Sequence, residues 1–149
     1  MGHFGAAWLE RQSRSKEENP ELAVDLLDLN KSLVVADFGA GTGYFTSQLA
    51  KQCSVVYAVD IQSEMIQLNK KNMQSKNIQN VKYVLNTPKQ TNLPQNSIDL
   101  ILLVDVYHEL EFPFEVIIDM KNSLKSNGQI VLLEYRAEDP SVPIKALHK

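Results

Sequence analysis

Three alternate glycines directly after an apolar, valine-rich run constrain this sequence more than any other feature. Residues 33–36 are apolar and include two valines, which favours a strand covered on both faces. Asp37 ends that run, and Gly39, Gly41 and Gly43 follow at every second position. Because glycine reaches positive φ and carries no Cβ, a ligand can lie against the bare backbone of such a turn. In an open α/β sheet, this turn at the carboxyl end of a strand is where ligands bind.

A second acidic residue, Asp60, ends another apolar run, over residues 54–60. An acid about 20 residues after a glycine loop, at the tip of the neighbouring strand, can accept hydrogen bonds from both ribose hydroxyls. The alternative is that Asp60 only caps the helix that follows. Dinucleotide binders and S-adenosylmethionine binders both use an acid here, so Asp60 favours a nucleoside ligand without choosing between them.

The glycine spacing separates these two ligands. The dinucleotide fingerprint is G-x-G-x-x-G, whose helix holds a pyrophosphate. Here the pattern is an acid followed by x-G-x-G-x-G, and a carboxylate at Asp37 would repel a pyrophosphate but suit an ammonium group. The block Val35–Gly43 resembles motif I of the class I S-adenosylmethionine-dependent methyltransferases, and the resemblance extends over about residues 33–136.

The resemblance implies a Rossmann-like methyltransferase fold, an α/β fold with a doubly wound, mostly parallel sheet. In that family the strand order is 3-2-1-4-5-7-6, and the last two strands form an antiparallel hairpin. The chain reaches Lys149 with room for about five strands, so the hairpin is expected to be missing. The fifth strand would then be an exposed edge that invites homodimerisation. Residues 1–31 are expected to be an arm and a helix packed on the domain, and residues 32–149 the cofactor-binding domain.

Periodicity and turn signals place the individual elements. Strands are predicted over 33–37, 54–60, 81–85, 97–104 and 129–135, and helices over 44–52, over 63–73 and from Pro113 to a glycine stop at Gly128. A further helix begins at Asn19-Pro20, a cap followed by proline in the first turn. Its predicted apolar stripe is Leu22, Leu26 and Leu29.

The cofactor contacts implied by the resemblance follow the strand ends. The residues expected to contact S-adenosylmethionine, or its product S-adenosylhomocysteine, are Asp37, Phe38, Gly39, Ala40, Gly41, Gly43, Tyr44, Asp60, Ile61, Met65, Asn86, Thr87, Asp105 and Val106. Ile61 and Met65 can lie against adenine, although core packing explains Met65 at least as well. Asn86 and Thr87 stand where the family often has an acid that contacts the adenine amino group.

The chemistry of methyl transfer points to the fourth strand end. Transfer from a sulfonium is an in-line displacement that depends mainly on alignment, and a general base is needed only where the acceptor must lose a proton. The catalytic candidates are Asp105, Tyr107 and His108, with His108 as the base because histidine titrates near neutral pH. The alternative is that His108 makes a local hydrogen bond and only shapes the pocket. Glu134, at the end of the fifth strand, is a weaker candidate, and no metal is expected.

Composition and net charge limit the kinds of molecule that this chain is expected to bind. The formal net charge of −3 gives no basic surface for nucleic acid, and the Asp105–His108 segment lacks the proline pair of many base-modifying methyltransferases. A small-molecule acceptor is therefore expected. A single cysteine, Cys53, excludes an internal disulfide and favours a cytoplasmic location. No apolar run approaches the roughly 20 residues of a membrane span.

Three functions compete on this sequence. An S-adenosylmethionine-dependent methyltransferase fits the two acids and the glycine spacing. A non-catalytic methyltransferase-like domain that binds cofactor or a partner is the alternative, because substrate-binding elements of the family are expected to be missing from this chain. A nicotinamide-dependent oxidoreductase would need the other glycine spacing. The N-terminal segment is either an arm docked through Trp8 or a lid that brings Arg11 or Arg14 to an anionic substrate.

Overall fold

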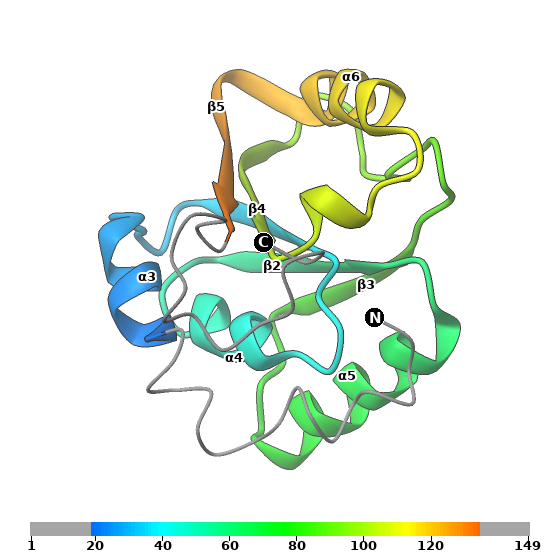
Figure 1. Cartoon of the computed structure of the whole chain (residues 1–149). Helices are drawn as coiled ribbons and strands as arrows, with labels where there is room; N and C mark the ends of the chain where they lie inside the picture. The colour runs from blue at the N-terminus through cyan, green and yellow to red at the C-terminus, as the bar shows by residue number, and fades with distance from the viewer. Residues whose placement is uncertain (1–18, 135–149) are drawn as a thin grey trace, which may run out of the picture.

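A parallel sheet forms the centre of the molecule. The computed structural model describes residues 19–134, in which five strands lie in the order β3-β2-β1-β4-β5 with every neighbouring pair parallel (Figure 1). The strands are β1 (Val34–Phe38), β2 (Val55–Asp60), β3 (Val81–Leu85), β4 (Ile98–Val104) and β5 (Leu124–Leu133). This confirms the predicted doubly wound, Rossmann-like sheet of five strands.

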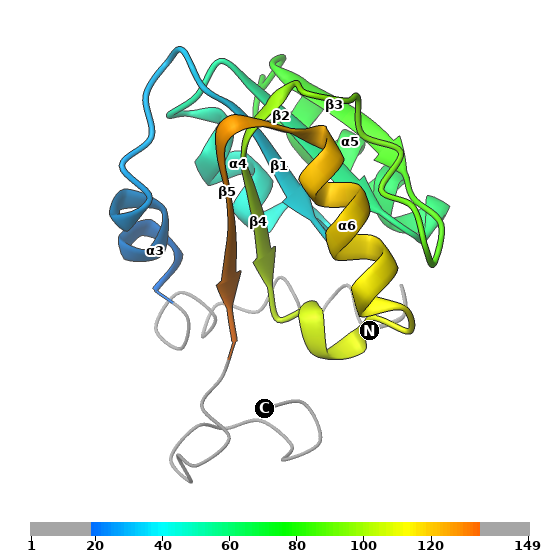
Figure 2. The same cartoon turned by 90° about the horizontal axis from the view of Figure 1, so that it is seen from above.

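Helices cover both faces of the sheet. The helices are α3 (Pro20–Leu26), α4 (Tyr44–Ala50), α5 (Ser63–Ser75) and α6 (Pro113–Ser123), with a short 3-10 turn η2 (Tyr107–Glu109). The first three lie on one face and α6 on the other, as Figures 1 and 2 show. Right-handed crossovers between parallel strands account for this arrangement.

Alternate residues of the central strands supply two cores. Val35 and Leu102 are buried in the core that includes α3 and α4, whereas Ala36 and Leu103 are buried in the core that includes α6. Side chains of a strand point alternately to opposite faces, so the continuous apolar runs seen in the sequence are needed to fill both cores. The register then aligns the carboxyl ends of the strands at one edge, where Phe38 pairs with both Val59 and Leu103.

Helix α3 begins as predicted but packs on a different side. The Asn19 side chain accepts a hydrogen bond from Leu22 N at 3.3 Å, which confirms the cap. The predicted stripe is wrong for Leu22 and Leu26, which are 52% and 77% exposed, whereas Val24 is fully buried. Leu29 does pack on the core, but it lies beyond the end of the helix. Val24 lies two residues from Leu22 and from Leu26, which places it on the opposite side of the helix. In a helix of only seven residues, the packing of one buried valine determines which side faces the core, and the spacing of the leucines does not.

The predicted glycine stop at Gly128 is also wrong. Helix α6 ends at Ser123, and Leu124 is already extended, with φ −73° and ψ 143°. Strand β5 therefore begins five residues before the predicted start at 129. A Cβ on Gly128 would lie 3.0 Å from the Ile98 carbonyl oxygen, so this glycine permits a close approach of two strands.

An irregular pairing accompanies that close approach. Ile98 pairs with Leu124, but Leu100 pairs with Gln129, so β5 carries extra residues opposite β4. A bulge of this kind bends a strand and re-aims the residues that follow it. From Leu100 onward the register is regular, and Val104 faces Leu133 at the end of the pair.

Several sequence-based expectations concern parts outside the described residues. Trp8, Arg11, Arg14 and the segment 135–149 lie there. The division at residue 31, homodimerisation through a sheet edge and the cytoplasmic location stay predictions. Within residues 19–134, no helix combines the length and apolar character that crossing a membrane requires.

Candidate cofactor and acceptor site

The glycine loop between β1 and α4 requires glycine for two reasons. Gly39, Gly41 and Gly43 have φ of 77°, 54° and 97°, a region that other residues rarely adopt. Space is also restricted: a Cβ on Gly39 would lie 2.3 Å from a Val106 methyl group, and one on Gly43 would lie 2.8 Å from Asn69 Oδ1. The loop is thus in contact with the residues after β4 on one side and with α5 on the other.

Asp37 lies beneath this loop. It is 3% exposed, and its Oδ2 accepts a hydrogen bond of 2.7 Å from the hydroxyl of Thr46. Thr46 belongs to the first turn of α4, so the pair joins the end of β1 to the helix after the loop. The predicted contact of Asp37 with an ammonium group stays a prediction, and the geometry gives Asp37 a structural partner as well.

Asp60 connects the loop to the next strand. Its Oδ2 accepts a hydrogen bond of 2.9 Å from Gly41 N, and its Oδ1 accepts one of 2.9 Å from Gln62 N at the start of α5. Burial raises the pKa of this carboxyl above its usual value, and the backbone N–H groups of Gln62 and Gly41 offset part of that shift. The helix-start contact agrees with the capping alternative. Each carboxylate oxygen has two lone pairs, so these bonds leave capacity for a ribose diol.

The other predicted adenine contacts differ in their exposure. Ile61 is 49% exposed beside Asp60, whereas Met65 is 2% exposed and offers little surface to a ligand. Asn86 and Thr87 follow β3, where the Thr87 hydroxyl accepts from Gln90 N at 3.0 Å and closes a turn. Asn86 donates to the Thr87 carbonyl at 3.0 Å. Their contact with adenine stays a prediction.

Two asparagines of α5 hold the loop, and the sequence analysis missed both. Asn69 Nδ2 donates to the Gly41 carbonyl at 3.3 Å and to Thr46 Oγ1 at 3.1 Å. Asn72 Nδ2 donates to the Thr42 carbonyl at 2.9 Å. Polar residues on a helix resemble a solvated face in sequence, so only the burial of Asn69, at 0% exposure, identifies it.

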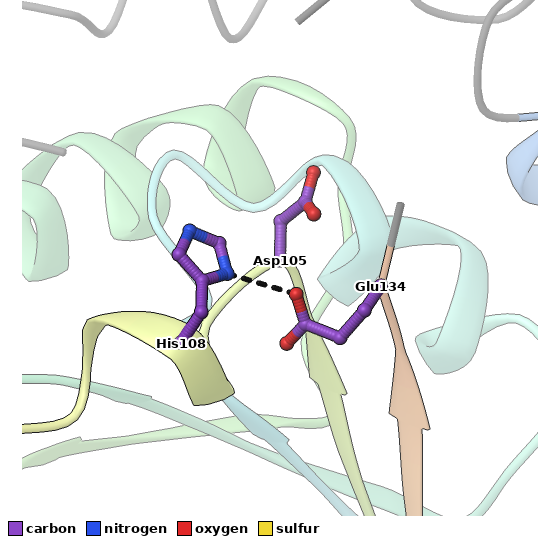
Figure 3. A group of neighbouring side chains, drawn as sticks. All are labelled: Asp105, His108 and Glu134. Carbon is purple, nitrogen blue, oxygen red and sulfur yellow. Dashed lines mark hydrogen bonds and ion pairs between the residues drawn. The ribbon is translucent and has the colours of Figure 1, made fainter. Parts of the chain in front are cut away.

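A second group of side chains lies at the ends of β4 and β5. Figure 3 shows Asp105, His108 and Glu134 side by side, with the His108 ring beside the Glu134 carboxylate. His108 Nδ1 is 2.8 Å from Glu134 Oε2, and Tyr107 N donates to Glu134 Oε1 at 2.9 Å. The three candidates predicted after β4, Asp105, Tyr107 and His108, are therefore brought together, and Glu134 joins them.

Backbone geometry sets the direction of this group. Asp105 has φ of 55°, which is uncommon for a residue with a side chain, and its N–H donates to the Leu133 carbonyl at 2.8 Å. Val104 and Leu133 are register partners, so Asp105 and Glu134 leave the sheet side by side. The sequence named Glu134 only as a weaker candidate at the end of the fifth strand, and this pairing shows why it lies beside Asp105.

The three side chains could also hold a divalent cation. One donor atom each from Asp105, His108 and Glu134 lie within 4.8 Å of one another. Carboxylate and imidazole donors suit several divalent metals. However, both Glu134 oxygens already accept from or pair with neighbouring nitrogen atoms. This arrangement fits a hydrogen-bonded pair at least as well as a metal centre.

The two groups form one site. The contact between Gly39 and Val106 places the glycine loop directly beside the segment that carries Asp105 and His108. A loop that can cradle a nucleoside thus borders polar side chains suited to proton transfer. Together with the strand order, this defines the class of Rossmann-like methyltransferase folds.

Comparison with known proteins identifies the family. The model of a methyltransferase domain family matches residues 36–132, and the chain belongs to that family. The class predicted from the glycine motif is confirmed by this match. The matched range begins in β1 and ends within β5, so it contains the glycine loop, Asp60 and His108.

Individual relatives match over shorter ranges. The chain is 39% identical over 70 residues to a probable cobalt-precorrin-6B C(15)-methyltransferase of Methanocaldococcus jannaschii, a match that covers 47% of this chain and 38% of the relative. It is 37% identical over 87 residues to phosphoethanolamine N-methyltransferase 3 of Arabidopsis thaliana, covering 58% and 17% of the two chains. The chain therefore spans well under two thirds of these relatives.

A solved structure supports the fold. The crystal structure of a SAM-dependent methyltransferase from Aquifex aeolicus superimposes with a TM-score of 0.92 at 22% identity. The superposition covers 100% of this chain and 81% of that one.

Proposed function

We propose that this chain binds S-adenosylmethionine and transfers its methyl group to a small-molecule acceptor. The single observation that supports the proposal most is the contact between the two halves of the site. Gly39 of the glycine loop packs on Val106, which is two residues from His108. A methyl donor held by the loop would lie next to the catalytic candidates that follow β4.

The cofactor half uses residues that match the family motif. Asp60 would accept the ribose hydroxyls, and the loop from Gly39 to Gly43 would lie along the amino-acid part. Ile61, which is half exposed beside Asp60, would cover one face of adenine. The remaining predicted contacts, from Asp37 and from Asn86 and Thr87, complete a path along the carboxyl ends of β1, β2 and β3.

The acceptor half of the site consists of the residues at the ends of β4 and β5, namely Asp105, Tyr107, His108 and Glu134. This group can move one proton. When bound, S-adenosylmethionine would supply an electrophilic methyl group, which the acceptor's lone pair would take while the sulfur kept the electrons of the broken bond. Where the acceptor carries a proton, His108 Nε2 takes it. Glu134 Oε2 accepts the Nδ1–H of the ring and so favours the tautomer in which Nε2 is the basic atom. Asp105, whose carboxylate lies near this ring, and Tyr107, whose N–H donates to Glu134, would contact the acceptor.

Two observations favour a small molecule as the acceptor. The relatives include proteins named for precorrin and phosphoethanolamine methylation, and both names describe small molecules. The formal charge of −3 provides no surface that would attract a polyanion.

Calorimetry tests the proposal. We expect S-adenosylmethionine and S-adenosylhomocysteine each to bind the chain with one site. The proposal fails if neither ligand binds at millimolar concentration. A titration with NADH serves as the control, because the x-G-x-G-x-G spacing should not hold a pyrophosphate.

A further inference from the structure

We infer that Asn69 is a positioning residue that fixes the glycine loop and Asp37 for the cofactor. The inference rests on the proposed function for the identity of the ligand, but not for the conformation of the loop. It begins from a side chain that is fully buried although it is polar. Buried amides are costly unless they are hydrogen-bonded, so the bonds of Asn69 indicate what keeps it there.

The orientation of the Asn69 amide follows from its neighbours. A carbonyl oxygen can only accept, so the group beside the Gly41 carbonyl must be the Nδ2 donor, 3.3 Å away. The same nitrogen donates to Thr46 Oγ1 at 3.1 Å, and Thr46 donates in turn to Asp37 Oδ2 at 2.7 Å. Asn69, Thr46 and Asp37 thus form a directional chain in which each hydroxyl or amide proton has one assigned place.

This chain ties three elements to one loop. Asn69 comes from α5, Thr46 from α4 and Asp37 from the end of β1. The loop carbonyl at Gly41 is held by Asn69, while the N–H of the same residue is held by Asp60. The N–H and the carbonyl of Gly41 are therefore both hydrogen-bonded. These two bonds hold the residue at a positive φ, whereas an unrestrained glycine would also adopt other backbone conformations.

The Asn69 carbonyl oxygen also restricts the space beside Gly43 in the loop. It has no hydrogen-bond partner among residues 19–134, and it lies 2.8 Å from the position that a Cβ on Gly43 would occupy. An apolar side chain of the same volume would avoid the cost of that buried oxygen. The two donor bonds of Asn69, to the loop and to Thr46, offset this cost.

Asn72 provides a matched control on the same helix. Its Nδ2 donates to the Thr42 carbonyl at 2.9 Å, whereas the chain to Asp37 runs through Asn69 and Thr46. Asn72→Ala therefore removes a loop contact without breaking the chain to Asp37. Asn69→Ala removes a loop contact and breaks the chain.

The experiment measures S-adenosylhomocysteine binding by calorimetry and hydrogen exchange of residues 39–47 in the ligand-free protein. Loss of two hydrogen bonds of ordinary strength should raise the Kd about tenfold for Asn69→Ala, with two- to threefold expected for Asn72→Ala. Exchange in the loop should be faster in Asn69→Ala than in Asn72→Ala. A Kd within twofold of the wild type, together with unchanged loop exchange, would overturn the inference.

Thr46→Val keeps the experiment decisive if Asn69→Ala folds poorly. This nearly isosteric change removes the middle of the chain, so on its own it should raise the Kd for S-adenosylhomocysteine several-fold and speed exchange in residues 39–47. A Kd and a loop exchange equal to those of the wild type would overturn the inference. If the wild-type chain binds no S-adenosylhomocysteine, the proposed function fails, while loop exchange in the ligand-free variants still decides the role of Asn69.

Discussion

The two acids that anchor this site are held in different ways. Asp60 is 7% exposed, and both of its oxygens accept backbone N–H groups, from Gly41 and Gln62. Glu134 has a side chain that is 25% exposed, and one of its oxygens pairs with a side chain, His108. The acid of the cofactor half is thus held by backbone N–H groups, whose positions the fold determines. The acceptor half is built on side chains that can change while the fold stays the same.

The most damaging test of this comparison exchanges one residue from each half. Asp60→Ala removes a charged acceptor for Gly41 and for the ribose that we propose it binds, and bonds to charged groups contribute about 1.5–3 kcal/mol. We expect the Kd for S-adenosylhomocysteine to rise about 100-fold, measured by calorimetry. His108→Ala should leave this Kd within twofold. Equal effects would contradict the division into two halves.

The contact between Gly39 and Val106, which joins the cofactor half of the site to the acceptor half, should give the next largest effect when it is changed. Gly39→Ala places a methyl group against Val106 at a φ of 77°, and we expect the free energy of unfolding to fall by about 2 kcal/mol in urea denaturation. Adding Val106→Ala should recover the steric part only, because the backbone strain remains. Full recovery in the double variant would show that the strain at Gly39 is negligible.

A pH titration sharpens the role of Asp60. Because burial raises its pKa, the carboxylate becomes protonated at a higher pH than the usual 3.8. The ionised form accepts the Gly41 N–H and, in the proposed function, the ribose hydroxyls, so cofactor affinity should fall several-fold as the pH drops through this raised pKa. The stability of the ligand-free fold should move in the opposite direction. A group with a raised folded pKa contributes stability below its unfolded pKa, and this contribution is lost as the pH rises.

Asp60→Asn is the control for this titration. It should bind more weakly at neutral pH and lose the acid-dependent part of the change in Kd. A profile identical to that of the wild type would assign the pH dependence to another group.

The smallest effect on cofactor binding is expected from Glu134→Gln. The change removes the carboxylate that faces His108 Nδ1, and the Kd for S-adenosylhomocysteine should stay within twofold. Nitrogen NMR of the His108 ring should show the Nδ1–H tautomer in the wild type and a mixture in the variant. A wild-type ring protonated only on Nε2 would contradict the proposed direction of proton transfer. Titration with Mn²⁺ under the same conditions distinguishes a metal centre, which would show binding that Glu134→Gln abolishes.

Sequence reasoning found the parts of this site that depend on local pattern. The spacing of Gly39, Gly41 and Gly43 is local, and the apolar run before each acid fixes the strand end that carries it. These signals gave the five parallel strands and the family. Asp60 and Asp105 followed because each ends such a run, and His108 lies three residues after Asp105.

The parts that sequence reasoning missed depend on tertiary packing. Asn69 looks like a solvated helix residue until α5 is placed against the loop. Gly128 follows a polar turn that is typical of a helix end, but the approach of Ile98 determines its place within β5. Val24 outweighed Leu22 and Leu26 because contact with the sheet, rather than spacing, selects the buried side of a short helix.

The irregular pairing of β5 has a consequence for how this chain could acquire a different acceptor chemistry. The extra residues between Leu124 and Gln129 set the phase of every later residue in the strand, including the one that delivers Glu134 to the site. Deleting a single residue there would turn each of them to the opposite face. One short length change, more than 15 Å of extended chain away by the usual rise per residue, would thus replace the acceptor chemistry while Asp60 and the glycine loop keep their cofactor.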